Sequence, residues 1–206
     1  MIETLLLMDP TTVAAFLLAG IVLNLTPGAD VMFATACGLS GGWRGGVAAA
    51  FGVALGSGVH VGLATVGISA AILAVPHAYD IIRWAGAIYL LWLAWAAWTA
   101  PPPKPDQGRR TYQAAIRKGF VTNLLNPKVA LFIMAFLPQF ATPEIGPIWH
   151  QTLGLGLLFI VTGLVITSGY GAFAGLFGAA LGKVQGVMGK VSALVFGGLA
   201  ARIILE

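Results

Sequence analysis

The sequence predicts an all-α integral membrane protein with six transmembrane helices, arranged as two inverted three-helix repeats. Three observations lead to this fold class: the composition, six long apolar runs, and a proline break in the first and fourth runs. Of the 206 residues, 58% are hydrophobic and only 9% are charged, and the mean hydropathy is +0.90. Because a soluble domain carries about 25% charged residues, this chain has too little charge to cover a surface that faces water. Its apolar side chains are expected to contact membrane lipid.

Each apolar run is long enough to cross a bilayer as a helix, which takes about 20 residues. Stretches rich in glycine, proline and charged residues separate the runs. The six predicted spans are 11–39, 47–75, 81–99, 120–140, 148–181 and 187–205. They form a single transmembrane domain over 1–206, with a first repeat at about 1–99, a loop at about 100–118 and a second repeat at about 119–206.

Basic residues gather in alternate gaps between the spans, which predicts the orientation of the chain in the membrane. The gaps after the first, third and fifth spans hold Arg44, Lys104, Arg109, Arg110, Arg117, Lys118, Lys183 and Lys190. The other gaps and the termini hold Glu3, Asp9, Asp80, Glu144 and Glu206, with Arg83 and Arg202 as the basic exceptions. By the positive-inside rule, both termini lie outside and the loop at 100–118 is cytoplasmic.

The two halves of the chain resemble each other in span length and in the position of a helix break. The order of lengths is long, long, short in the first half and roughly long, long, short in the second. The first span carries Pro27 and Gly28 at its middle, and the fourth carries Pro127. Proline lacks the N–H of a helical hydrogen bond, so both spans are expected to be broken there. Inverted repeats with matching broken helices are typical of secondary transporters.

Asp30 is the most informative single residue. It follows the first break and lies about 11 residues before the glycine-rich gap, hence roughly 16 Å into the membrane at 1.5 Å per residue. An ionised carboxylate at that depth costs at least a few kcal/mol, and such residues usually serve function. Asp30 is therefore predicted to bind a proton or a cationic substrate group. The alternative is a neutralised or ion-paired Asp30 that only holds helices together.

Lys128 is predicted to lie at a similar depth, just after the second break. Two opposite charges in one layer partly offset each other's desolvation, so Asp30 and Lys128 are expected to share one cavity. A zwitterion would then place its ammonium on Asp30 and its carboxylate on Lys128. The alternative is that Lys128 extends to the cytoplasmic interface. Four polar residues flank the breaks and complete the predicted substrate and proton site: Asn24, Thr26, Asn123 and Asn126.

Other function classes receive less support from the residues. Gly56-Ser57-Gly58 with His60 is weakly similar to an intramembrane serine hydrolase, but no carboxylate is evident to orient the histidine. The net charge of +4 lies in the gaps rather than on one basic surface, so nucleic acid is not an expected partner. A small-cation or heavy-metal exporter is the main alternative, although Asp30 and the single Cys37 are too few for a metal site inside the membrane. No catalytic or metal-binding residue is assigned.

Glycines on the second predicted span favour close helix packing. Gly52 and Gly56, like Gly58 and Gly62, repeat at four-residue intervals, which lets two helices approach closely. The contact could lie within one chain or between two copies in a homodimer.

Several segments resemble the LysE/RhtB family of bacterial amino-acid exporters. Segment 24–30 reads NLTPGAD, 117–128 reads RKGFVTNLLNPK and 131–140 reads LFIMAFLPQF. Segments 86–94 (GAIYLLWLA) and 197–202 (GGLAAR) are similar to the third and last spans of that family. Ala29 departs from the pattern, since many members carry a second proline there, and a milder break is expected as a result.

The resemblance implies export of amino acids or related small metabolites from a bacterial cytoplasm, driven by the proton motive force. It implies a multi-pass protein of the inner (plasma) membrane that is not an enzyme and uses no cofactor besides the proton. It does not choose among lysine, threonine, homoserine, homoserine lactones and leucine as substrates.

Overall fold

The computed structural model describes residues 2–74 and 111–177, with scattered positions between 84 and 99 and between 190 and 201. The predicted third and sixth spans therefore lie largely outside the described residues, as does the predicted loop up to residue 110. The regular elements of the two continuous ranges are all helical: α1 (Ile2–Leu7), α2 (Pro10–Leu25), α3 (Ala29–Ala74), α5 (Tyr112–Leu124), α6 (Pro127–Leu131), a π-helical stretch η1 (Phe132–Phe136), a 3-10 stretch η2 (Leu137–Phe140) and α7 (Ile148–Phe177).

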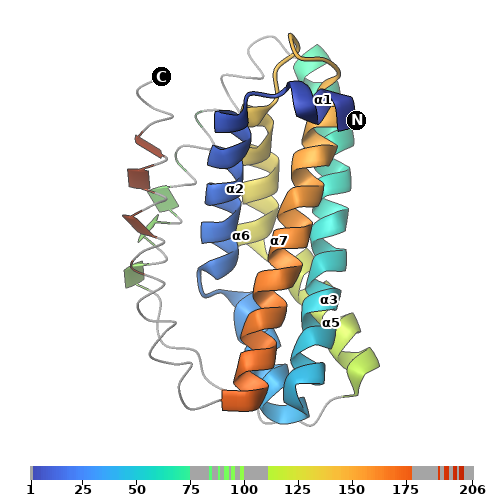
Figure 1. Cartoon of the computed structure of the whole chain (residues 1–206), viewed down its shortest axis with the longest axis vertical. Coiled ribbons are helices and arrows are strands. Elements are labelled where there is room, and N and C mark those ends of the chain that lie inside the picture. The colour runs from blue at the N-terminus through green and yellow to red at the C-terminus, as the bar shows by residue number, and fades with distance from the viewer. Residues whose placement is uncertain are drawn as a thin grey trace.

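The helices run roughly side by side along the long axis of the molecule (Figure 1). The chain runs down α2 and the first part of α3, turns at Gly42, and returns along the rest of α3. It then rises through α5 and α6 and descends through α7. The end of the bundle that carries α1 and the connection at 141–147 is called the α1 end. The opposite end, which carries the turn and the start of α5, is called the Gly42 end.

The turn between the first two predicted spans is much shorter than expected. Residues 41–46 were predicted to separate the spans, yet Gly42 is the one residue inside α3 with non-helical backbone angles (φ 70°, ψ −179°). A positive φ is strained for residues with a Cβ, so glycine suits this position. Gly45 serves packing instead: a Cβ there would lie 2.7 Å from the Cys37 carbonyl oxygen, which shows how closely the two arms of α3 pack against each other.

The fourth predicted span begins earlier than expected and is broken where expected. Its helix starts at Tyr112 instead of 120 because one face of α5 packs on α3, where Ala115 and Gly119 are buried, while Arg117 and Lys118 stay exposed. The last part of the predicted loop at 100–118 is therefore helical. The axis bends by 53° between α5 and the segment that begins at Pro127.

Close approach of glycine backbones joins α3 to its two main neighbours, α7 and α5. A Cβ on Gly38 would lie 2.0 Å from the Gly171 carbonyl oxygen, and one on Gly52 would lie 2.1 Å from that of Ile116. The Gly52 contact is therefore made within one chain. Cβ atoms on Gly58 and Gly62 would meet no described atom within 4 Å, so a homodimer contact at that face stays a prediction.

The α1 half of the bundle has an aromatic core. Successive pairs of its phenylalanine rings have centroids 4.8–6.4 Å apart. The rings come from α2, the irregular segment after α6, and α7, and they are Phe16, Phe132, Phe136, Phe140 and Phe159. Ala94 and Ala200, in the predicted third and sixth spans, pack against the same core.

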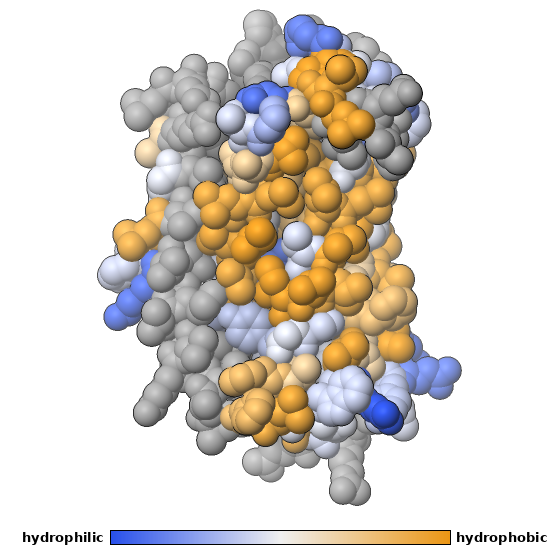
Figure 2. All heavy atoms as spheres, viewed as in Figure 1, coloured by the Kyte–Doolittle hydropathy of each residue, from blue (hydrophilic) through white to orange (hydrophobic). Residues whose placement is uncertain are grey.

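The described helices suit a membrane. By length and composition, Ile148–Phe177 can cross a bilayer, and so can the apolar stretch Ala29–Gly67, which the turn at Gly42 divides into two arms. The bent pair Tyr112–Leu124 with Pro127–Phe140 counts as a further candidate span. Figure 2 shows hydrophobic residues over the middle of the visible face and hydrophilic residues toward its two ends. The all-α membrane fold is confirmed at this level, while the six-span inverted repeat stays a prediction.

Described charges separate between the two ends of the bundle as predicted. Arg44, Arg117 and Lys118 belong to the Gly42 end, whereas Asp9 and Glu144 lie at the α1 end. The pKa of the Asp9 carboxyl is lowered by hydrogen bonds from Thr11 at the start of α2, so this end keeps its negative charge. Which end faces the cytoplasm stays a prediction from the positive-inside rule.

Replacing Gly38 tests the close packing of α3 on α7. Gly38→Ala places a methyl group against the Gly171 backbone, and such overpacking typically costs about 1–3 kcal/mol. The midpoint of thermal unfolding in detergent should therefore fall. Gly67→Ala, at an exposed position on the same helix without a described neighbour, is the matched control and should stay within about 0.5 kcal/mol of the wild type. Equal unfolding midpoints for both variants would contradict this packing.

Candidate functional site

The two helix breaks meet in the middle of the bundle. Thr26, Pro27 and Gly28 separate α2 from α3, and Leu125 and Asn126 separate α5 from α6. Ala29 is the first residue of α3, so a single proline is enough to interrupt the span here. Asp30 follows the first break and Lys128 follows the second, which brings both charges to the point where the broken helices meet.

Asp30 accepts hydrogen bonds from both asparagines of the second broken helix. Asn123 Nδ2 donates to Asp30 Oδ2 at 2.8 Å, and Asn126 Nδ2 donates to the same oxygen at 2.9 Å. Asp30 is only 9% exposed and stands in the first turn of α3, where the helix dipole favours a negative charge. Its other oxygen, Oδ1, is buried and has no hydrogen-bond partner among the described residues.

The Lys128 ammonium lies at the end of α2. Its Nζ donates to the carbonyl oxygens of Leu23 at 2.9 Å and Thr26 at 2.8 Å, and its charge interacts with that of Asp30. The side chain is thus directed into the protein and does not extend to the interface. Gly28 leaves room for it, since a Cβ there would lie 3.2 Å from Nζ. Lys128 satisfies carbonyl groups that the first break frees from helical hydrogen bonds.

Three further backbone groups near the breaks have side-chain partners. Thr26 Oγ1 donates to the Val22 carbonyl oxygen at 2.6 Å, and the Tyr170 hydroxyl of α7 donates to that of Leu25 at 3.0 Å. Asn126 Oδ1 accepts from the backbone N–H of Lys128 at 3.0 Å, which caps α6. Pro127 then occupies the first helical position, where its missing N–H costs nothing.

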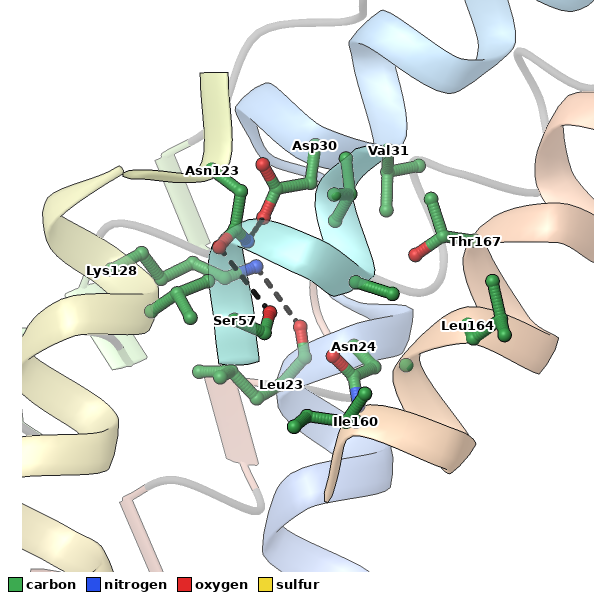
Figure 3. Close-up of a pocket in the computed structure, with 14 residues that line it drawn as sticks. Leu23, Asn24, Asp30, Val31, Ser57, Asn123, Lys128, Ile160, Leu164 and Thr167 are labelled. Carbon is green, nitrogen blue, oxygen red and sulfur yellow. Dashed lines mark hydrogen bonds between the residues drawn. The ribbon is translucent and has the colours of Figure 1, made fainter. Parts of the chain in front are cut away.

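A small cavity adjoins these groups. Asp30 and Lys128 both line it, as do Asn24 and Asn123 (Figure 3), so the predicted shared cavity is present. Thr26 and Asn126 contribute through their contacts with Lys128 and Asp30. The cavity volume is about 20 Å³, enough for roughly one water molecule. A molecule as large as an amino acid therefore does not fit into the cavity unless the helices move apart.

Two residues that were not predicted as part of the site join this network. Ser57 Oγ donates to Asn123 Oδ1 at 3.3 Å, and His60 Nε2 lies 3.2 Å from the Asn123 carbonyl oxygen. Both side chains are buried. A histidine in the middle of an apolar span was the available signal, but the sequence linked it to hydrolysis and not to the Asp30 site. The role of Tyr170 was not predicted either, because a single tyrosine in an apolar helix gives no indication of its hydrogen-bond partner.

Comparison with known proteins agrees with these observations. The family described as LysE type translocator matches residues 21–206, a range that contains both helix breaks and every residue of the cavity. The chain belongs to the LysE type translocator family. This is a family of translocators and not of enzymes, which leaves the hydrolase alternative without support from the family.

Individual relatives extend over most of the LysE-type chain. A Vibrio cholerae protein described as an uncharacterized membrane protein is 34% identical over 174 residues, covering 83% of this chain and 84% of the relative. A homoserine/homoserine lactone efflux protein of Salmonella typhimurium is 33% identical, covering 78% and 79%, and one of Salmonella typhi is 32% identical with the same coverage. No solved structure matches the chain.

Removing the Tyr170 hydroxyl tests how the first break is stabilised. Tyr170→Phe leaves the Leu25 carbonyl oxygen without its donor, and a lost hydrogen bond of this kind costs about 0.5–1.5 kcal/mol. The unfolding midpoint in detergent should fall accordingly. Tyr112→Phe is the matched control, because Tyr112 is exposed at the start of α5, and it should unfold like the wild type. An unchanged midpoint for Tyr170→Phe would contradict the assigned role.

Proposed function

We propose that this protein is a secondary active exporter of amino acids or related small metabolites, driven by the proton gradient across the inner membrane of a bacterium. One observation carries the proposal: a buried carboxylate, Asp30, accepts hydrogen bonds from donors of the second broken helix and lies close to the partly buried Lys128. The family supports transport. We further propose that six spans form two inverted repeats around this site, as the two facing breaks suggest.

The site suits a substrate with an ammonium group. In the closed conformation Asp30 is balanced by the charge of Lys128 and by two amide donors. A proton or a substrate ammonium would provide the same balance, so the two can replace each other on Asp30. Exchange of a proton for a substrate on one carboxylate couples export to the proton gradient, provided that Asp30 becomes accessible from one side of the membrane at a time.

Lys128 is proposed to serve the substrate carboxylate once the cavity opens. Its ammonium now binds the carbonyl oxygens of Leu23 and Thr26, and these contacts can return when the substrate leaves. Asn24, Thr26, Asn123 and Asn126 complete the proposed substrate and proton site.

Two different sets of packing contacts separate the cavity from the two ends of the bundle. The phenylalanine core lies toward the α1 end, and the backbone contact between Gly38 and Gly171 lies toward the Gly42 end. We propose that substrates pass when one of these contacts opens while the other holds. The π-helical stretch η1 (Phe132–Phe136) supports movement at the aromatic side, because π-helical turns occur frequently at functional sites.

The printed names of relatives narrow the substrate class. Two Salmonella relatives are homoserine/homoserine lactone efflux proteins, and both compounds carry an ammonium group. We propose substrates of this kind. The alternative, a heavy-metal exporter, gains no support from the described part of the chain, where no three histidine, cysteine or carboxylate side chains gather.

Asp30→Asn tests the coupling role. The amide keeps the size of the side chain and can accept from Asn123 and Asn126, but it cannot exchange a proton. Purified protein in proteoliposomes with an imposed pH gradient should lose gradient-driven transport of labelled homoserine and other amino acids, down to the level of empty vesicles. Asp9→Asn is the matched control: Asp9 is exposed and caps α2, and asparagine also serves as an N-cap, so its transport should stay at the wild-type rate.

Transport by Asp30→Asn at the wild-type rate under the same pH gradient would refute the coupling role. The same folded fraction of both variants in size-exclusion chromatography would show that the difference concerns transport and not folding.

A further inference from the structure

The cavity contains a second recognition group besides Asp30. The Asn24 side chain lines the cavity, and its Nδ2 is buried without a hydrogen-bond partner among the described residues. Asp30 Oδ1 is the other cavity atom in this position. A buried donor or acceptor that lacks a partner destabilises the folded protein. A ligand that forms hydrogen bonds with both atoms would remove this cost. One is an acceptor with negative charge and the other is a neutral donor.

Asp30 and Asn24 belong to different sides of the cavity. Figure 3 shows Asp30 beside Asn123, and Asn24 on the opposite side near Ile160. A ligand that uses both residues needs a cationic group at one end and a hydrogen-bond acceptor at the other. α-Amino acids fit this requirement, and so do their lactones and amides, because all of them carry an ammonium group on the carbon next to a carbonyl group.

Gly163 on α7 leaves the space that the Asn24 amide occupies. A Cβ on Gly163 would lie 3.2 Å from Asn24 Oδ1 and 3.3 Å from Nδ2. These distances are tighter than ordinary van der Waals contact, so a side chain at position 163 would displace the amide from its present position. Gly163 also lines the cavity itself, which means that a methyl group there would reduce the available space as well.

We propose that Asn24, supported by Gly163, donates a hydrogen bond to the carbonyl oxygen of the substrate, while Asp30 binds its ammonium. The proposal rests on the proposed exporter function and specifies its substrate class: α-amino carbonyl compounds, with or without a free carboxylate. A neutral donor explains how one site can serve both an amino acid and its lactone, since Asn24 requires no negative charge on the substrate. Lys128 adds affinity for those substrates that carry a carboxylate.

The test compares three probes in proteoliposomes: homoserine, homoserine lactone and 3-aminopropan-1-ol, which keeps the amine and the hydroxyl but lacks the carbonyl group. The wild type should transport the first two and discriminate against the third. Asn24→Leu has a similar size but no donor. It should reduce transport of homoserine and of its lactone about tenfold each, the equivalent of one good hydrogen bond, with little effect on 3-aminopropan-1-ol.

Two glycine variants provide a second arm that does not alter Asn24. Gly163→Ala should reduce transport of both carbonyl compounds several-fold by displacing the amide. Gly169→Ala, on the same helix and without a described atom within 4 Å, is the matched control and should transport like the wild type. Binding of each probe, measured as a shift of the unfolding midpoint of purified protein, should follow the same order.

The failure of this inference differs from the failure of the proposed function. If the wild type transports none of the probes and none of a wider amino-acid panel, the exporter proposal fails. If the wild type transports homoserine and Asn24→Leu keeps the full preference over 3-aminopropan-1-ol, the exporter proposal stands and the role of Asn24 is refuted. Equal effects of Gly163→Ala and Gly169→Ala would refute the role of Gly163.

Discussion

Hydrogen bonds from Asn123 and Asn126 to the buried carboxylate of Asp30 hold the two broken helices together. A carboxylate in an apolar bundle is stable only where charge or donors surround it, and here the donors come from the other half of the chain. Ser57 and His60 of α3 hold Asn123 in turn. The position of α5 relative to α3 therefore depends on a group whose charge changes when it takes up a proton.

The break after α2 is stabilised because three of its backbone carbonyl groups have partners inside the protein. Backbone polar groups without partners cannot remain in lipid. Lys128 binds two carbonyl oxygens at the end of α2, and Tyr170 binds a third. These contacts involve residues from α6 and α7, so a movement that separates those helices from α2 would break hydrogen bonds at the first break. Under the proposed transport cycle, the groups that are freed would become available to a substrate.

The membrane fold, both breaks and the shared cavity of Asp30 and Lys128 could be predicted, because apolar run length, proline and depth along a helix are local properties of a sequence. The partners of Lys128 and the roles of Ser57 and His60 could not, because they depend on the rotation of each helix about its axis. The length of the turn at Gly42 was also missed: glycine signals either a turn or close packing, and only the packed structure distinguishes them.

Chemical modification of Asp30 tests the central claim most directly. A membrane-permeant carbodiimide reacts with a protonated carboxyl group in an apolar site, and peptide mass spectrometry measures the modified fraction of Asp30 in reconstituted protein. If Asp30 exchanges a proton for the substrate ammonium, Asp30 should be modified, and a saturating transported amino acid should protect it. An Asp30 that stays unmodified at mildly acidic pH, or that is modified equally with and without the substrate, would contradict the account.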